Sequence, residues 1–329
     1  MSFSNSFKAS LFSVNDSNFE KYALELFNHQ AKHNQIYGKY VELIGREPQS
    51  VVCLEQIPFL PISLFKSQKI VTGDWNPEHI FQSSGTTGTI TSKHYVRYIP
   101  EYLDNAERIF ESQFGSLKEY HILALLPSYL ERDNSSLVCM VEYFMQKSLS
   151  EFSGFYLDDY EDLINSLLSA YESKRKVLLI GVTFGLLDFI EKHQFNMPEL
   201  VVMETGGMKG RRKEMVREEV HDQLKKGFGV ENIYSEYGMT ELLSQAYSEG
   251  DGLFNMNNTL KVLIRDFNDP YSYQPIGRTG GINVIDLANV DSCAFIETQD
   301  LGKCHDQNTF EVIGRFDNSD IRGCNLMVN

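Results

Sequence analysis

The sequence lacks the long apolar run that a membrane-spanning helix needs. Its longest apolar stretches, such as residues 177–182, are far shorter than the ~20 residues that cross a bilayer. The first eleven residues, MSFSNSFKASL, contain no continuous apolar segment of the kind found in secretory signals. We therefore expect neither a membrane span nor an export signal.

Cysteine is scarce, and basic residues are outnumbered. The 5 cysteines are scattered and form no CxxC pair, which fits a reducing compartment better than a disulfide framework. The 30 Lys and Arg against 45 Asp and Glu give a net charge of −15, which disfavours nucleic acid and anionic membranes as partners. A nucleotide would need local backbone N–H groups or a metal to offset this charge. These features predict a cytoplasmic protein.

Apolar residues are plentiful, at 42% of the 329 positions, and their spacing predicts the fold class. Helical periodicity between residues 19 and 44 predicts two amphipathic helices. Apolar strands at 80–81, 121–126, 176–181, 200–203 and 233–234 then alternate with helical segments at 104–114, 160–171, 182–193 and 211–226. This alternation predicts an α/β fold with parallel strands flanked by helices, and short apolar pieces after Asn255 predict an antiparallel β region.

The strongest local signal is the run Ser83-Ser84-Gly85-Thr86-Thr87-Gly88, with Lys93 following. Glycines let the backbone approach a ligand closely, and hydroxyls with successive N–H groups can surround phosphate oxygens. Lys93 adds a mobile positive charge. An ordinary surface loop is the alternative for so short a motif, which is not a GxxxxGK[ST] phosphate loop.

Three further motifs are weak when each is taken alone. The block from 236 to 241, EYGMTE, offers Tyr237 to stack on a base and Glu241 to face a metal-bound phosphate, although a turn with an N-cap threonine is the simpler explanation. Asp300, in the TQDLG block, can accept two ribose hydroxyls, but such turns are common. Arg315, in the GRFD block, can hold ribose or phosphate oxygens, with a surface hairpin as the alternative.

The order of these four motifs resembles that of the adenylate-forming superfamily of acyl-CoA synthetases, luciferases and nonribosomal peptide adenylation domains. That superfamily has an SSGTTG-type loop followed by a lysine, then YGxTE, TGD and GRxDxxIxxRG blocks, in the order seen here. The third block departs from the pattern, because Gln299 replaces a glycine while Asp300 is kept. Segments at 57–66, 204–212 and 321–326 are further similar to acyl-protein synthetases of the bacterial bioluminescence type.

The resemblance implies an ATP site with roles for individual residues. The β- and γ-phosphates would be held by the loop that includes Ser83 and Gly85, chiefly through Ser84, Thr86, Thr87, Gly88 and Lys93. The adenine would be lined by Gly206, Gly207 and Tyr237, with Gly238 beside them. The ribose would be held by Asp300 and Arg315. Thr240 would contact the α-phosphate and Glu241 would bind magnesium, so that Lys93, Thr240 and Glu241 are the expected catalytic residues.

The resemblance also implies one adenylate-forming domain over 1–329. It would comprise a helical lead-in at 1–56, an α/β nucleotide-binding core at 57–254, and a β region with a hinge-like tail at 255–329. The chain stops at Asn329, directly after the hinge-like block, so we expect the mobile C-terminal domain of the superfamily to be absent. This expectation puts ligation to coenzyme A in doubt.

The activity implied is ATP-dependent conversion of a carboxylic acid, a fatty acid by family analogy, to an acyl-adenylate. The acid is already ionised at pH 7 and needs no general base, which matches a motif set without a His-based triad. Cys324 would then accept the acyl group as a thioester and pass it to a partner protein such as a reductase; a passive, packed cysteine is the alternative. An acyl-CoA or aryl-CoA ligase and a non-catalytic nucleotide-binding scaffold remain open for the whole chain.

Overall fold

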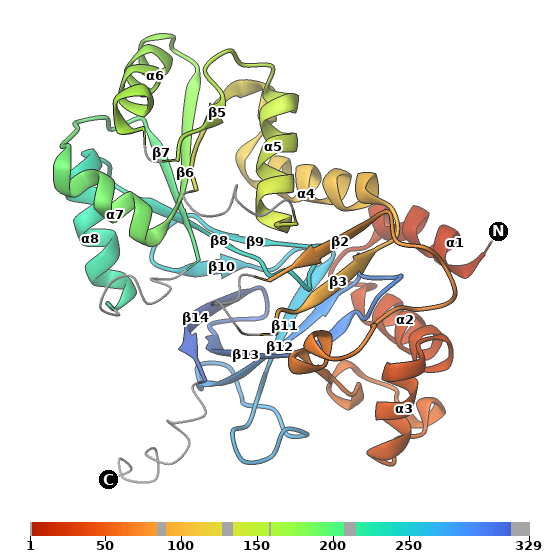
Figure 1. The fold of residues 1–329 in the computed structure, drawn as a ribbon. Helices are drawn as coiled ribbons and strands as arrows, with labels where there is room; N and C mark the ends of the chain where they lie inside the picture. The colour runs from red at the N-terminus through yellow and green to blue at the C-terminus, as the bar shows by residue number, and fades with distance from the viewer. Residues whose placement is uncertain (1, 84–89, 127–133, 158, 207–214, 317–329) are drawn as a thin grey trace, which may run out of the picture. The chain divides into compact units, whose positions relative to one another are not determined.

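The computed structural model describes residues 2–83, 90–126, 134–157, 159–206 and 215–316 (Figure 1). The chain divides into two compact units. Unit 1 comprises Met1–Glu78, Ile90–Arg97 and Asn255–Asn329, and unit 2 comprises His79–Thr89 and Tyr98–Phe254. Unit 1 is thus assembled from three separate stretches of sequence, whereas unit 2 is almost continuous.

Unit 2 is built on a parallel sheet. Its parallel strands lie in the order β5 (Gly154–Phe155), β4 (Tyr120–Leu125), β6 (Lys176–Val182), β7 (Val201–Thr205) and β8 (Ile233–Tyr237). The short strands β9 (Ala246–Ser248) and β10 (Leu253–Asn255) continue the sheet beyond β8, with β9 antiparallel to β8. Every residue of β4 is buried, as expected of a strand covered on both faces. Strand β2 (His79–Gln82) also belongs to this unit.

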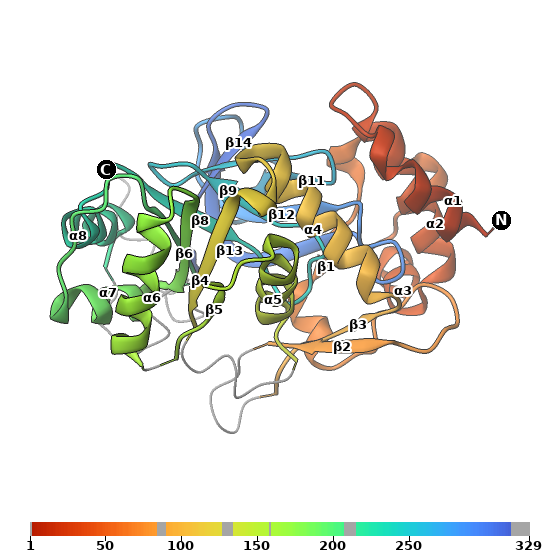
Figure 2. The same cartoon turned by 90° about the horizontal axis from the view of Figure 1, so that it is seen from above.

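Helices cover both faces of this sheet. One face carries α6 (Tyr160–Glu172), α7 (Thr183–Lys192) and α8 (Arg217–Phe228), and the other carries α4 (Ile99–Phe114) and α5 (Ser136–Ser148) (Figures 1 and 2). The chain steps from β4 to β5 in one direction and from β6 to β8 in the other, so right-handed crossovers place the helices on opposite faces. Ligands of open α/β sheets bind at the carboxyl ends of the strands where this direction reverses. In unit 2 that point lies between β4 and β6.

Unit 1 combines helices with an antiparallel sheet. Its sheet consists of β11 (Leu260–Arg265), β12 (Gly280–Asp286), β13 (Phe295–Cys304) and β14 (Thr309–Arg315), and β1 (Leu60–Pro61) pairs in parallel with β13. The helices are α1 (Phe3–Ser10), α2 (Phe19–His33) and α3 (Gln35–Leu43), and β3 (Lys93–Val96) is a further strand. The core centres on Phe295, whose ring lies 6.0 Å from Phe27, 5.9 Å from Tyr37 and 6.3 Å from Phe59 between centroids.

The turn at 287–294, between β12 and β13, anchors the N-terminal helices of unit 1. The Asp291 carboxylate accepts a hydrogen bond from Ser4 at 2.9 Å and pairs with Lys8, both on α1. Gln30, on α2, donates to two carbonyls of this turn and accepts from the Ala294 amide at 2.9 Å. These bonds join residues that are 259 to 287 positions apart. The helices at the start of the chain are therefore held by its last quarter.

The predicted fold class is confirmed, with differences at the ends of elements. Helix α4 starts at Ile99 rather than at residue 104, because Pro100 suits a first helical turn. The helix predicted at 211–226 has the wrong start, because residues 215–216 are not helical. Residues 211–214 lie outside the described residues. Helix α8 begins at Arg217, which puts Glu218 and Glu219 in the first turn and two lysines in the last, as the helix dipole favours.

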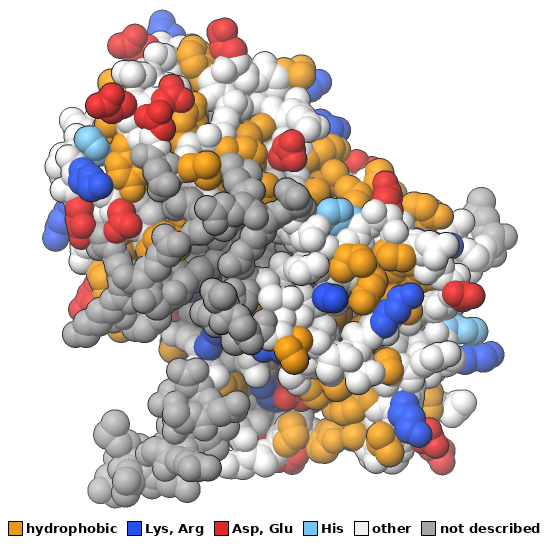
Figure 3. Space-filling model, viewed as in Figure 1, with side chains coloured by type: hydrophobic (Ala, Val, Ile, Leu, Met, Phe, Trp, Pro, Cys, Tyr) orange, Lys and Arg blue, Asp and Glu red, His pale blue; other side chains and the backbone are white. Residues whose placement is uncertain are grey.

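The surface of unit 2 carries both signs of charge. Acidic and basic side chains are interspersed over α6, α7 and α8 on the face drawn in Figure 3. In the described part of the chain, no helix is both long enough and apolar enough to cross a membrane.

Candidate functional site

The predicted ATP-site residues belong to both units. Unit 2 carries Ser83, Gly206, Tyr237, Gly238, Thr240 and Glu241, and unit 1 carries Lys93, Asp300 and Arg315. Several lie outside the described residues, namely Ser84, Gly85, Thr86, Thr87, Gly88, Gly207 and Cys324. That the segments near residues 85 and 240 meet on one ATP molecule therefore stays a prediction.

In unit 2, the predicted adenine-lining residues lie at the carboxyl ends of neighbouring strands. Gly206 directly follows β7 and Tyr237 ends β8, and the pairing of Thr205 with Glu236 sets these ends side by side. Gly206 has φ of 71°, a left-handed conformation that glycine adopts without strain. Gly206 and Tyr237 thus lie next to each other at the carboxyl edge of the sheet, beyond β6 on the side away from β4.

Two buried carboxyl groups lie on these same strands, one on each face of the sheet. Glu204 accepts a hydrogen bond from the hydroxyl of Thr183, the first residue of α7, at 2.6 Å. Glu236 accepts one from the hydroxyl of Thr205. Because side chains alternate along a strand, Glu204 faces α7 and α8 whereas Glu236 points to the opposite side. Both carboxyl groups lie in segments singled out from the sequence, 204–212 and 236–241, but neither was predicted to have a role in the site, although polar residues within apolar strands are a visible signal.

The two carboxyl groups differ in pKa because their surroundings differ. Burial raises the pKa of Glu236 to about 7. The hydrogen bond with Thr205 acts to lower this pKa, and the nearby Glu204 charge acts to raise it. Burial also acts to raise the pKa of Glu204, but His221 at 3.8 Å, Arg217 and Thr183 together hold it below its ordinary value. At neutral pH, Glu204 is therefore charged while Glu236 is partly protonated.

These groups also constrain the loops that follow the strands. The single hydroxyl proton of Thr183 is shared between Glu204 and the Gly206 carbonyl, and this shared hydrogen bond ties the backbone at the exit of β7 to the start of α7. A Cβ at Gly238 would lie 2.3 Å from Oε1 of Glu236, so a larger residue at the exit of β8 would displace that carboxyl group. Both predicted adenine-lining segments thus rest on buried polar side chains.

The turn that carries Thr240 and Glu241 is tied to α4. Asn105 donates to the Leu243 carbonyl at 2.9 Å, and Gln245 donates to the carbonyl of Ala106 at 2.9 Å. Glu241 is buried within this turn. Among the described residues, no three His, Cys, Asp or Glu side chains gather into a metal-binding group. A single carboxylate still fits magnesium that is held mainly by phosphate oxygens.

In unit 1, the structure brings the two predicted ribose-binding residues together. Asp300 and Arg315 stand opposite each other in the ladder of β13 and β14, and Arg315 Nε lies 3.2 Å from Asp300 Oδ1. The Asp300 side chain is only 10% exposed and that of Arg315 is 68% exposed. A largely buried carboxylate is therefore paired with an accessible cation. Lys93 is the exposed first residue of β3.

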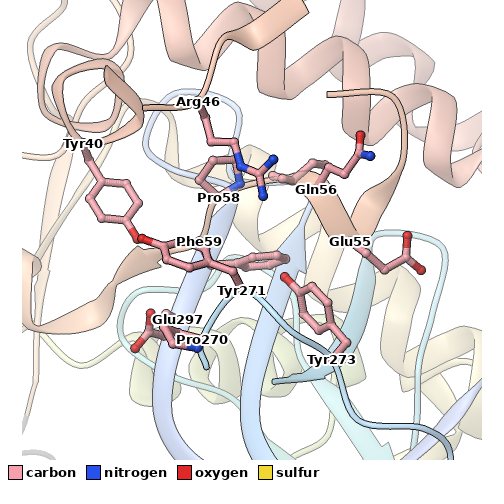
Figure 4. Close-up of a pocket in the computed structure, with 11 residues that line it drawn as sticks. Tyr40, Arg46, Glu55, Gln56, Pro58, Phe59, Pro270, Tyr271, Tyr273 and Glu297 are labelled. Carbon is pink, nitrogen blue, oxygen red and sulfur yellow. The ribbon is translucent and has the colours of Figure 1, made fainter. Parts of the chain in front are cut away.

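A separate pocket lies in unit 1 and is lined by several aromatic side chains together with Glu55 and Glu297 (Figure 4). Tyr40, Tyr273 and Phe59 are among its lining residues, and Arg46 reaches towards its centre. The cavity volume is about 10 Å³, which is the space of about one water molecule. This pocket is therefore too small for a nucleotide or an acyl chain.

Comparisons with known proteins place this geometry in a family and a fold. Residues 9–329 match the sequence model of the family described as "Acyl-protein synthetase, LuxE". A comparison with curated proteins finds no significant match. The fold is similar to 2-hydroxyisobutyryl-CoA ligase in an open conformation with 2-HIB-AMP and CoA, with a TM-score of 0.69, 13% identity, and coverage of 92% of this chain and 70% of that chain. It is also similar to ATP-bound MatB from Rhodopseudomonas palustris, with a TM-score of 0.53, 14% identity, and coverage of 72% of this chain.

The chain covers 47% of the MatB chain, which is less than half of its length. At these identities the likeness to solved structures shows the fold alone, which is that of adenylate-forming enzymes.

Proposed function

The chain belongs to the acyl-protein synthetase family described as LuxE, and we propose that it uses ATP to activate a carboxylic acid as an acyl-adenylate. The observation that carries this proposal is the family match over 9–329, which spans all four motifs. The family and the fold are both those of acyl-adenylate-forming ligases. In this reaction the two units act as one adenylate-forming domain.

The proposed reaction is an in-line displacement at the α-phosphorus. A carboxylate oxygen of the acid forms a bond to phosphorus, the bond to the bridging oxygen of the β-phosphate breaks, and pyrophosphate leaves. Lys93, Thr240 and the hydroxyl-rich loop at 83–88 bind the phosphates and stabilise the charge that develops on them. Magnesium held by Glu241 would neutralise further phosphate charge when bound. Positioning of the two reactants supplies the rest of the rate enhancement.

The remaining predicted site residues hold the nucleoside of ATP. Gly206, Gly207 and Gly238 let the backbone approach the adenine, and Tyr237 contributes an aromatic surface. Asp300 accepts the ribose hydroxyls while Arg315 orients its carboxylate, in line with the 3.2 Å contact between the two side chains.

The finer proposal is that the acid is a fatty acid and that Cys324 is the first acyl acceptor. The Cys324 thiol would first lose its proton to solvent. The thiolate would then attack the acyl carbon, forming a thioester as the bond to AMP breaks and AMP leaves. The acyl group would then move to a partner protein such as a reductase. Because the reaction consumes ATP and a free thiol, we place it in the cytoplasm. The likeness to a ligase bound to CoA favours direct transfer to coenzyme A as the second candidate.

The test of adenylation is ATP–pyrophosphate exchange with acids of graded chain length. We expect exchange that depends on the acid, and its loss in Lys93→Ala but not in Lys39→Ala, which removes an exposed lysine outside the motifs. Absence of exchange across the whole panel of acids would refute the proposal and favour a nucleotide-binding scaffold.

The test of the acceptor uses radiolabelled acid and ATP, followed by denaturation and treatment with hydroxylamine. Label on the protein should be released by hydroxylamine, retained in Cys53→Ser and absent in Cys324→Ser. Label that persists in Cys324→Ser excludes this cysteine. Exchange without protein label, together with formation of acyl-CoA, would identify the CoA ligase.

A further inference from the structure

Asp300 lies within a bulge of β13. On β12, Gly281 pairs with Leu301 and Asn283 pairs with Glu297, so residues 298–300 of β13 stand opposite Ile282 alone. A bulge of this kind breaks the ladder and redirects the side chains that it contains. The direction in which the Asp300 side chain leaves the backbone is therefore set by the groups that hold the bulge, while Arg315 contacts the carboxylate at its end.

Arg265, the last residue of β11, holds this bulge from inside the sheet. Its Nη1 donates to the Ile282 carbonyl and to Asn283 Oδ1, both at 2.9 Å, and its Nη2 donates to the Thr298 carbonyl at 2.7 Å. The guanidinium is buried and also lies 3.8 Å from Glu297. It thus satisfies carbonyls that the irregular pairing leaves inside the protein, where an unpaired polar group is costly.

A second set of bonds joins the bulge to Asp300 itself. The Thr298 hydroxyl donates to the Ile282 carbonyl at 2.8 Å, and the Asp300 amide donates to the Thr298 hydroxyl at 3.0 Å. The carbonyl at Gln299 accepts from the amide of the residue that follows Arg315, at 2.7 Å. Arg265 and Asp300 are therefore linked through Thr298, with the backbone between them fixed at each residue.

Gly281 makes room for this arrangement. A Cβ at Gly281 would lie 2.4 Å from Cζ of Arg265, so a larger residue would displace the guanidinium. The ring of Phe316 packs on the other side, with its centroid 5.7 Å from Arg265 Cζ. A lysine cannot replace the arginine here, because one ammonium group does not reach the three acceptors that the planar fork serves.

We propose that Arg265 is a positioning residue that holds the β13 bulge in the shape that presents Asp300 to the ribose of ATP. The inference rests on the proposed function, because it takes the ribose as the ligand of Asp300. Arg265 acts only through Asp300 and makes no contact with the nucleotide itself.

The test measures how strongly the enzyme prefers ATP to 2′-deoxy-ATP, as a ratio of kcat/KM values in the exchange assay. Hydrogen bonds to a charged group are worth ~1.5–3 kcal/mol, so Asp300→Ala should reduce the preference by about tenfold or more. We expect Arg265→Lys to reduce it to a similar extent, and the double variant to show no further loss. Ile285→Val, which weakens the core of β12, should lower both kcat/KM values equally and leave the ratio unchanged.

The outcomes separate the inference from the function on which it rests. An unchanged ratio in Arg265→Lys, with a reduced ratio in Asp300→Ala, overturns the inference alone. An unchanged ratio in Asp300→Ala overturns the ribose assignment and the inference with it. If Arg265→Lys does not fold, Asn283→Ala removes one of the acceptors of the guanidinium and should lower the ratio by about threefold; an unchanged ratio there also overturns the inference.

Discussion

Replacing Glu236 by glutamine should stabilise the protein relative to wild type, and the difference should grow as the pH rises. The carboxyl is buried at the end of β8, and burial raises its pKa from 4.5 to about 7. Between these values the folded protein retains a proton that the unfolded chain has released. Its stability therefore falls as the pH rises through this window and is lowest above the folded pKa. Glutamine does not titrate and can still accept the hydrogen bond of Thr205.

The shift sets the size of the effect. A shift of this size corresponds to about 3 kcal/mol in total, most of which develops between pH 5 and pH 8. Glu204, on the other face of the sheet, and Tyr247 are ionisable groups close enough to interact electrostatically with Glu236. Neither changes charge in this window, because the pKa of Glu204 is held below its ordinary value and burial raises that of Tyr247.

The assay is urea unfolding of wild type and Glu236→Gln at pH 5, 6, 7 and 8. The free energy of unfolding of the variant, relative to wild type, should rise by about 2–3 kcal/mol across the series. Glu218→Gln, which alters an exposed carboxylate on α8 of the same unit, serves as the control and should show no such trend. Parallel curves for Glu236→Gln and wild type would refute the assignment of a raised pKa to this group.

Three further predictions concern the site, the core and the metal. Gly238→Ala should lower exchange activity, because its Cβ would meet Glu236 Oε1 at 2.3 Å; unchanged kinetics in that variant would mean that the exit of β8 is not constrained. Phe295→Ala should cost about 3–5 kcal/mol in the free energy of unfolding, measured in urea, because the ring lies at the centre of the unit 1 core; a cost below 1 kcal/mol would contradict that placement. Chelation by EDTA should abolish exchange and added Mg²⁺ should restore it, whereas activity that survives EDTA would exclude the role proposed for Glu241.

The fold was predictable where its signals are local. The continuous apolar runs that became β4 and β6 are typical of strands buried on both faces, and their alternation with helical periodicity indicated parallel pairing. The ends of helices were harder to predict. Helix α8 begins only at Arg217, which places the acidic Glu218 and Glu219 in the first turn, where the helix dipole favours negative charge. The charged segment that predicted this helix begins earlier, at residue 211. Helices α1 and α5 were not predicted at all.

The residues of the candidate site stay predictions from their motifs, and the side chains that support them were not predicted. Tyr237 and Asp300 could be identified by type and order, and the structure places them at the end of β8 and within β13. Glu204 and Arg265 acquire their roles only through residues far along the chain. The guanidinium serves a bulge defined by the pairing of Gly281 with Leu301, and no pattern within β11 encodes that register. Long-range pairing of this kind is invisible to local sequence rules.

The division of unit 1 into separated stretches has a consequence for synthesis on the ribosome. Unit 2 is complete once Phe254 has emerged, but α1 and α2 must wait for Asp291 and Ala294 before their polar anchors exist. At ~5–20 residues per second, the 255–329 stretch takes roughly 4–15 s to translate. During that interval α1 and α2 lack the contacts that Asp291, Ala294 and Phe295 later supply.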